Sequence, residues 1–379
     1  MKKLLPEVCT IQYGFPFDSA KFSDSNGMPL IRIRDVVRGY SETYTTEEYK
    51  SEYIVHENDL LIGMDGEFNI AKWGKTPALL NQRVCRLAPK DSIDKDYLFY
   101  FMPIALKRIE EKTPFVTVKH LSAKELNKIE IPVLPLEEQR KIAETLSKVD
   151  ELIAFREQQL AKLDELVKAR FVEMFGDPAD NVNNLPASPM TAICQIIDGD
   201  RGKNYPKQEE FSDSGFCLFL NAKNVTAQGF SFENCTYITE EKDALLRNGK
   251  LCRGDVVLTT RGTIGNLAFY DTSVPYENIR INSGMVILRM NKQVVSEIFF
   301  IEQFKMQLDS IKSRIASGSA QPQLPISTMN KIEMILPPIE LQKQFAAFVE
   351  RVDQQKQTVQ QSLEKLELMK KALMQEYFG

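Results

Sequence analysis

The side chains that could perform chemistry are scattered along this chain of 379 residues. Gly74-Lys75-Thr76 resembles the end of a phosphate-binding loop, but Asn69 stands where that loop requires its first glycine. The two histidines, His56 and His120, are too few for a zinc site, and the carboxylates show no paired arrangement. The methyltransferase signature Asn-Pro-Pro-aromatic does not occur. We therefore predict no catalytic residue and no metal site in this chain.

Composition limits the class of protein. The six cysteines show no C-x-x-C spacing, and no apolar run reaches about 18 residues, which is typical of a reduced protein without a membrane span. The basic start, Met1–Pro6, is not followed by the hydrophobic core of a signal peptide. We expect a soluble, cytoplasmic protein in which Cys217, Cys235 and Cys252 are core side chains.

The chain contains one unit twice. Gly379 lies 203 positions after Gly176, and the stretches that end at these two glycines align without a gap. Asn127–Glu130, for example, returns as Asn330–Glu333. A repeat of this length indicates a duplicated domain rather than a solenoid module.

Further upstream, short hydrophobic anchors are repeated, with loops of different length between them. Asp59–Ile62 corresponds to Asp255–Leu258, and both have the composition of strands. Polar loops follow these anchors, at residues 63–75 and 259–282. Because loops on a constant scaffold tend to carry function, we expect two mixed α/β globular domains that recognise two different targets.

Each half then ends in the same series of elements. Hydrophobic residues predict buried helices over Tyr97–Ile109 and Ile298–Ile311. Ser122–Glu125 has the Ser-x-x-Glu pattern of a capped helix start. The proline-bounded segments Ile129–Pro135 and Ile332–Pro338 then lead into a long helix in each half.

Apolar residues recur every three or four positions in both long helices, which is typical of a coiled coil. We expect globular domains over residues 1–136 and 177–338, and long helices over 137–176 and 339–379. The predicted seam between the helices comprises Val149, Ile153, Leu160, Leu163, Val167, Met174, Val352, Val359, Leu363, Leu366, Leu373 and Tyr377.

Cations on this seam favour an antiparallel pair. In a parallel pair, Arg156 and Arg170 would each lie against an apolar residue. In the antiparallel pair, Arg156 shares a layer with Lys370 and Arg170 with Lys356, where long stems can carry the charges to water. The apolar layers would be Val149 with Tyr377, Ile153 with Leu373, Leu160 with Leu366, Leu163 with Leu363, Val167 with Val359, and Met174 with Val352. Such a pair implies pseudo-two-fold symmetry.

The hinge before each long helix is the most specific motif: Ile131–Gln139 and, less perfectly, Leu336–Gln342. With these hinges and its other repeated motifs, the whole chain resembles the DNA specificity subunits of type I restriction-modification systems (the HsdS family). The other motifs that carry the resemblance are Gly14–Phe17, Pro29–Ile33, Thr117–Leu121, Arg261–Gly265 and Ile281–Val286. In the second half, Gly318–Leu324 departs from the Thr-Lys-His-like string that the family often carries there.

The resemblance implies a non-catalytic subunit with two target-recognition domains, each of which recognises one half of a bipartite, asymmetric DNA site. The helix pair would set the spacer and dock partners. The implied partners are double-stranded DNA, two methylation (HsdM) subunits and a restriction (HsdR) subunit. S-adenosylmethionine would bind the methylation subunit, and ATP and Mg would bind the restriction subunit, so that this chain itself holds no cofactor.

Base edges are distinguished by Arg, Lys, Asn, Gln and hydroxyl side chains, which selects candidate DNA contacts in the loops. In the first domain these are Lys72, Asn81, Gln82, Arg83, Thr117, Lys119 and His120. In the second domain they are Arg201, Lys203, Asn204, Tyr205, Lys223, Arg261, Thr263, Arg280, Asn282, Gln321 and Gln323. The net charge of −4 indicates that a partner helps to hold the DNA.

Other interpretations stay open at this point. The chain could be a duplicated coiled-coil scaffold without DNA binding, or the specificity component of another DNA-modifying defence complex. A nuclease with a fused methylase is disfavoured by the missing tetrapeptide and the short length. Long amphipathic helices also serve in homodimers, but the duplication within one chain favours an intramolecular pair.

Overall fold

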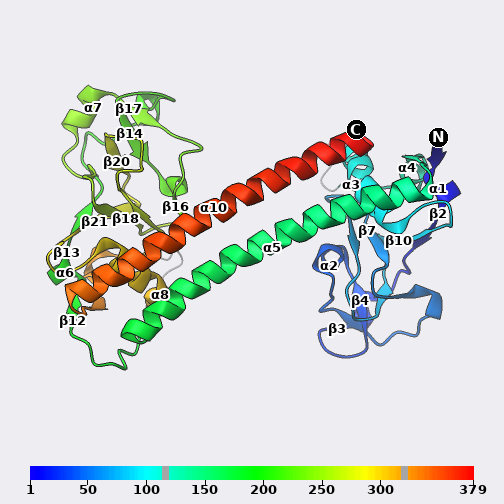
Figure 1. The fold of residues 1–379 in the computed structure, drawn as a ribbon, viewed down its shortest axis with the longest axis horizontal. Helices are drawn as coiled ribbons and strands as arrows, with labels where there is room; N and C mark the ends of the chain where they lie inside the picture. The colour runs from blue at the N-terminus through cyan, green and yellow to red at the C-terminus, as the bar shows by residue number, and fades with distance from the viewer. Residues whose placement is uncertain (113–118, 317–322) are drawn as a thin grey trace. The chain divides into compact units, whose positions relative to one another are not determined.

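The computed structural model describes residues 1–112, 119–316 and 323–379, and these form two compact units. Unit 1 comprises Met1–Glu157 and Gln361–Gly379, and unit 2 comprises Gln158–Gln360. Each unit therefore contains part of both long helices, α5 (Leu136–Phe175) and α10 (Ile339–Phe378) (Figure 1). The bounds of both helices lie within one residue of the expected ranges.

The main sheet of unit 1 has the strand order β2-β10-β7-β8, with every neighbouring pair antiparallel. Side chains of β7 alternate between two cores: Leu60 and Ile62 pack in the cluster that contains α3, whereas Leu61 packs with Trp73 on the other face. This alternation follows from the period of two in a strand. The strands are β2 (Cys9–Tyr13), β7 (Leu60–Gly63), β8 (Asn69–Lys72) and β10 (Val84–Pro89), and α3 is Lys95–Lys112.

A second sheet of unit 1 has the order β3-β5-β4-β9-β6 and contains the parallel pair β4–β9. Its buried side chains, among them Ile31 and Leu80, cover the face of the main sheet that α3 does not. The elements are β3 (Phe22–Ser23), β4 (Met28–Ile31), β5 (Tyr44–Thr45), β6 (Ile54–Val55) and β9 (Ala78–Leu80), with the helix α2 (Ile33–Arg38).

Unit 2 repeats this plan, as the duplication predicts. Its main sheet has the order β13-β21-β18-β19, and its second sheet, β17-β14-β20, again contains a parallel pair, β14–β20. Val256 and Leu258 pack in the cluster with α8, whereas Val257 packs on the opposite face. The elements are β13 (Cys194–Asp198), β14 (Cys217–Leu220), β15 (Val225–Thr226), β16 (Gly229–Phe230), β17 (Tyr237–Ile238), α7 (Glu240–Leu245), β18 (Asp255–Thr259), β19 (Leu267–Phe269), β20 (Ile279–Ile281), β21 (Met285–Met290) and α8 (Glu297–Ala316).

The start of each unit pairs with the segment before the long helix. In unit 1, β1 (Lys2–Leu4) is antiparallel to β11 (Glu130–Pro132), and α1 (Leu5–Val8) follows β1. In unit 2, β12 (Ala187–Pro189) pairs with β22 (Glu333–Ile335), and α6 (Met190–Ile193) follows β12. Short helices precede the hinge strands, α4 (Ala123–Leu126) with its predicted Ser122 cap and α9 (Ile326–Met329).

Both units contain one end of an antiparallel helix pair, so the predicted orientation is confirmed. In unit 1, the last turn of α10 lies beside α3, and Phe378 contacts Tyr97 and Phe101 edge to face (Figure 1). In unit 2, Phe171 of α5 meets Phe345 of α10 in the same manner. All twelve predicted seam residues are buried or half-buried.

The predicted register of the pair, however, is wrong. In unit 1, Arg156 was expected beside Lys370, but Lys370 Nζ lies 2.6 Å from Asp150 Oδ1. Arg156 Nε instead donates to Ser362 Oγ at 3.2 Å. The helices are thus displaced along each other by about two turns from the expected layers.

Unit 2 shows the same displacement. Lys356 Nζ lies 2.6 Å from Asp164 Oδ1 rather than beside Arg170, and the guanidinium of Arg170 lies 5.9 Å from the ring centroid of Phe348. The apolar spacing alone could not distinguish these registers. The observed one pairs each lysine with a carboxylate of the opposite helix, which is more favourable than a layer that contains two cations.

Burial also corrects one expectation about the cysteines. Cys217 is buried and Cys235 is half-buried, but Cys252 is exposed.

Across residues 1–112, 119–316 and 323–379, the helices include none whose length and apolar character would allow it to span a membrane.

Candidate nucleic-acid interface

Three loops of unit 1 meet beyond the end of β7. The N–H of Met64 donates to the carbonyl oxygen of Arg83 at 2.9 Å, and the N–H of Leu121 donates to that of Met64 at 2.7 Å. Gly66 has a φ of 77°, a left-handed conformation that favours glycine. Its N–H donates to the carbonyl oxygen of Lys119. Backbone hydrogen bonds therefore hold together three segments that are distant in sequence. We call this arrangement of Met64–Gly66, Arg83 and Lys119–Leu121 the loop frame of unit 1.

This convergence brings a polar cluster of three side chains to the surface. Asp65 Oδ1 lies 2.5 Å from His120 Nδ1, and Asp65 Oδ2 lies 3.6 Å from Arg83 Nε. Arg83 Nη1 also lies 3.3 Å from His120 Nδ1. The side chains of Arg83 and His120 are about half exposed, at 52% and 47%, whereas that of Asp65 is 20% exposed. Donor groups thus face solvent around a more deeply placed carboxylate.

Asp65 was not among the predicted contacts. Its position could have been found from the repeat, since Asp65 precedes Gly66 as Arg261 precedes Gly262, and Arg261 was predicted. Carboxylates were not selected as candidate DNA contacts, because the phosphate backbone of DNA repels a negative charge.

The same backbone frame recurs in unit 2 with different side chains. The N–H groups of Thr260 and Leu324 donate to Gly284 and Thr260, respectively, each at 2.9 Å. Arg261 pairs with Gln323 across an isolated antiparallel bridge, as Asp65 pairs with His120. Arg261 and Gln323 are both exposed.

A hollow of about 320 Å³ opens beside this second frame. Its lining includes Arg201, whose Nη2 contacts Asp198 Oδ1 and the Ser283 carbonyl oxygen, both at 3.2 Å. It is lined by Asp198, Arg201, Thr260, Arg261, Val286, Gln323, Leu324, Pro325 and Ile326. Three predicted contacts, Arg201, Arg261 and Gln323, are therefore brought together.

The loop that carries Arg201 is held by the buried carboxylate of Asp200. Its two oxygens accept from the N–H groups of Gly202 at 2.6 Å and Arg247 at 2.7 Å. Burial raises the pKa of Asp200, but the donated backbone hydrogen bonds outweigh burial and hold the pKa below its usual value.

The other predicted residues of unit 1 differ in exposure. Lys72 is half-buried between Asp96, at 2.9 Å, and the ring of Phe99. Lys119 Nζ contacts Glu110. Asn81 is buried, and its carbonyl oxygen would collide with any Cβ at Gly14. Gln82 is exposed beside Arg83, whereas Thr117 lies outside the described residues.

Among the other predicted residues of unit 2, Arg280 changes role most clearly. It is buried, and its guanidinium pairs with buried Asp243 and donates to the carbonyl oxygens of Asn248 and Leu246. This is the position of a structural cation, so we no longer expect Arg280 to contact DNA. Burial raises the pKa of Asp243, but its bonds with Lys250 and Arg280 outweigh burial and lower it.

Three further predicted residues shape the loops of unit 2. Asn204 Nδ2 donates to the Leu245 carbonyl oxygen, Tyr205 packs on Phe219, and Asn282 Oδ1 accepts from the N–H of Gly284. The remaining predicted residues Lys203, Lys223 and Thr263 are exposed, and Gln321 lies outside the described residues.

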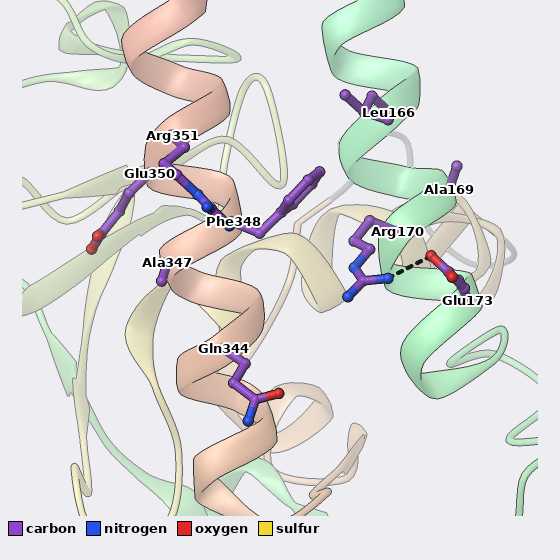
Figure 2. Close-up of a pocket in the computed structure, with 9 residues that line it drawn as sticks. All are labelled: Leu166, Ala169, Arg170, Glu173, Gln344, Ala347, Phe348, Glu350 and Arg351. Atoms are coloured by element: carbon purple, nitrogen blue, oxygen red, sulfur yellow. Dashed lines mark hydrogen bonds and ion pairs between the residues drawn. The ribbon is translucent and has the colours of Figure 1, made fainter.

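A groove also lies between α5 and α10 within unit 2, with a volume of about 1170 Å³. Figure 2 shows Phe348 projecting from α10 toward α5, with the Arg170–Glu173 ion pair on the other wall. Leu166 is 45% exposed in this groove. The groove therefore combines a small apolar surface with charged side chains, a mixture that suits contact with another protein.

No cluster of His, Cys, Asp and Glu with the geometry of a metal site occurs in the part of the chain that the structure describes. The arrangement of donors around the two loop frames suits hydrogen bonding to a polar ligand.

Comparisons with known proteins place this geometry in a family. The family model for the type I restriction modification DNA specificity domain matches residues 1–165 and 190–368. The type I restriction enzyme EcoBI specificity subunit of Escherichia coli is 28% identical over 380 residues, covering 92% of this chain and 78% of that protein. The MjaVIII specificity subunit of Methanocaldococcus jannaschii is 26% identical over 384 residues, covering 91% and 87%, respectively.

Solved structures share the fold at low sequence identity. The S subunit of a type I restriction-modification system from M. genitalium has a TM-score of 0.59 at 18% identity, and the match covers 100% of this chain and 96% of that one. A chain from a study of complex assembly and conformational transition of the type I R-M system has a TM-score of 0.57 at 15% identity, with coverage of 100% and 97%. Because the family model spans both units and relatives match nearly the whole chain, this protein belongs to the family of type I restriction-modification DNA specificity subunits.

Proposed function

We propose that each unit recognises one half of a bipartite, asymmetric DNA site. The observation that carries this proposal is the repeated loop frame: the same backbone hydrogen bonds present Asp65, Arg83 and His120 in unit 1 but Arg261 and Gln323 in unit 2. A constant scaffold with different exposed donors and acceptors is what two readers of different sequences require.

The chemistry of these side chains suits base edges in the major groove. In unit 2, Arg261 can donate twice to O6 and N7 of guanine, and Gln323 can pair with adenine. In unit 1, Arg83 and His120 supply donors, and exposed Gln82 lies next to them in the chain. Asp65 holds the orientation of Arg83 and His120 through its two contacts. Exposed Lys203 and Lys223 suit phosphate contacts.

The proposed protein partners are two methylation subunits and a restriction subunit. The groove between α5 and α10 in unit 2 offers apolar surface from Leu166 and Phe348 for a methylation subunit (Figure 2). The net charge of −4 supports a role for such a partner in holding DNA. We propose that the methylation subunit binds S-adenosylmethionine and the restriction subunit binds ATP and Mg. The present chain supplies sequence recognition and the spacing between half-sites.

Selection from a random duplex pool tests the proposal, with the full chain alone and with its methylation subunit. We expect the complex to enrich two short sequences separated by a gap of fixed length and free sequence. Enrichment of no two-part sequence in either condition would contradict the proposal and leave a protein-binding scaffold as the better interpretation.

A further inference from the structure

Two buried glutamines occupy matched positions at the start of the long helices. Gln139 of α5 and Gln342 of α10 are both 0% exposed, although glutamine is usually a surface residue. Each lies one turn into its helix, after the proline whose carbonyl oxygen accepts the first helical hydrogen bonds, Pro135 in unit 1 and Pro338 in unit 2. The proposed DNA contacts involve neither glutamine.

In unit 1, Gln139 joins three segments. Its Oε1 accepts from the N–H of Asp94 at 2.8 Å, and its Nε2 donates to the carbonyl oxygens of Ser92 at 3.2 Å and Leu134 at 2.7 Å. Asp94 in turn caps α3, because its Oδ1 accepts from the N–H groups that begin that helix. The amide therefore ties the start of α5 to the start of α3 and to the hinge.

Gln342 makes the same three bonds in unit 2. Its Oε1 accepts from the N–H of Ser296 at 3.0 Å, and its Nε2 donates to the carbonyl oxygens of Val294 at 3.1 Å and Pro337 at 2.8 Å. Ser296 precedes α8 as Asp94 precedes α3. Every partner is a backbone group, so the bonds are preserved although the partner residues differ in type.

A buried amide with three directed hydrogen bonds constrains orientation more than an apolar side chain of the same volume would. Apolar packing tolerates rotation and sliding, whereas each hydrogen bond requires a defined angle and leaves a costly unpaired group when it breaks. In each unit, two partners lie just before the buried helix of the globular part and the third lies within the hinge. The constraint therefore acts on the direction in which the long helix leaves its globular unit.

We propose that Gln139 and Gln342 are positioning residues that fix the exit direction of α5 and α10, and thereby the number of base pairs between the two half-sites. This inference rests on the proposed function, because a spacer exists only where two half-sites are recognised. Neither glutamine contacts DNA in this account.

The test measures spacer preference in the full complex of this chain with its methylation subunit. The probe is a set of duplexes that carry the two sequences selected by the wild-type complex, separated by gaps that vary by single base pairs. The variants are Gln139→Leu, Gln342→Leu and Gln139→Glu, and the matched control is Gln158→Leu at an exposed position of α5. Circular dichroism establishes that each variant is folded.

We expect Gln139→Leu and Gln342→Leu to reduce the preference for the best gap over its neighbours by about tenfold, with each half-site sequence unchanged. Gln139→Glu keeps an acceptor for the N–H of Asp94 but loses both donors and places a buried carboxylate beside two carbonyl oxygens, so its effect should be at least as large. The control should keep the wild-type preference.

Weaker binding with an unchanged gap preference would overturn the inference and leave the glutamines with a purely structural role. Loss of folding in both Gln139 variants would lead to the same conclusion. A wild-type complex that selects no two-part sequence would overturn the proposed function itself, and the inference with it. The two failures are therefore distinguishable.

Discussion

The two units present opposite charges from the same backbone position. Asp65 and Arg261 both precede a glycine with left-handed φ, 77° at Gly66 and 71° at Gly262, and both lie across a bridge from the third loop of their unit. The hydrogen bonds that shape the two frames connect equivalent backbone groups. The comparison shows that the same backbone hydrogen bonds form with a carboxylate or a guanidinium at this position.

The hinges show the reverse relation. Gln139 and Gln342 are identical and make the same bonds, although the residues around them differ. Buried groups whose partners are backbone atoms are constrained by geometry, whereas exposed groups at the loop frames can change in type while the backbone hydrogen bonds stay the same. The contrast separates positions that set architecture from positions that we propose to set specificity.

The largest expected difference between the units concerns two arginines that were both predicted to contact DNA. Arg280→Ala would leave Lys250 as the remaining partner of buried Asp243 and would remove the donor to the carbonyl oxygens of Asn248 and Leu246. It should lower the free energy of unfolding of unit 2 by about 3 kcal/mol. Arg83→Ala removes a half-exposed pair and should cost about 1 kcal/mol or less. Hydrogen exchange of peptides from each unit in rising urea measures both. Equal losses in the two variants would show that Arg280 has no special structural role.

The next effect is on recognition. Arg261→Gln should weaken binding of the complex to its selected sequence by about 1–3 kcal/mol and relax discrimination only in the half-site recognised by unit 2. Lys207→Gln, at another exposed cation of unit 2, is the control and should leave discrimination intact. Competition binding against duplexes altered in one half at a time gives the result. Relaxed discrimination in both halves would contradict separate readers.

A substitution in the groove of unit 2 should have a smaller effect, and this effect should be on binding to the methylation subunit. Leu166→Ala should weaken binding to the methylation subunit by about 1 kcal/mol, because Leu166 offers exposed apolar surface there. Leu341→Ala replaces a leucine of α10 that is also exposed but does not line the groove. Isothermal titration calorimetry compares the two variants. If Leu341→Ala has the larger effect, the partner binds elsewhere on the helices.

The smallest effect concerns the charged pair in the helix register of unit 2. Burial lowers the pKa of Lys356, but its bond with Asp164 and the charge of Asp353 outweigh burial and raise it. The stabilisation is therefore complete below about pH 10.4 and is lost as the pH rises through the folded-state pKa.

Urea midpoints at pH 9 and pH 11 test this sign. The wild-type protein should lose slightly more stability across this range, by less than about 1 kcal/mol, than Lys356→Met does. Lys343→Met, in an exposed pair with Glu340, serves as the control and should behave like the wild type. A Lys356→Met variant with the full wild-type pH dependence would contradict a stabilising role for the charged contacts of Lys356.

The sequence predicted the elements that periodic patterns and caps determine. The duplication, both long helices and the Ser122 cap all depend on local spacing and are found in the structure. The antiparallel orientation was also predicted, although the shared cation layers from which it was argued do not form. The register did not follow, since a coiled-coil seam repeats every seven residues and a displaced pairing buries the same kind of side chain.

The candidate site was predicted less completely. Side-chain type selected Arg83, His120, Arg261 and Gln323, which the structure brings together in two loop frames. It could not distinguish them from Arg280, because burial of a cation depends on a partner such as Asp243, 37 residues away in the chain. The repeat could have indicated the position of Asp65, but its contacts with Arg83 and His120 depend on the arrangement in space.

The claim that one backbone frame carries two independent readers is tested most directly by methylome sequencing of cells that carry this chain and its methylation subunit. The wild-type chain should yield one two-part motif with a fixed gap. The variant Asp65→Arg, which gives unit 1 the charge of unit 2 at this position, should alter bases on one side of the gap and leave the gap and the other side unchanged. Changes on both sides, or a motif without a gap, would contradict the account.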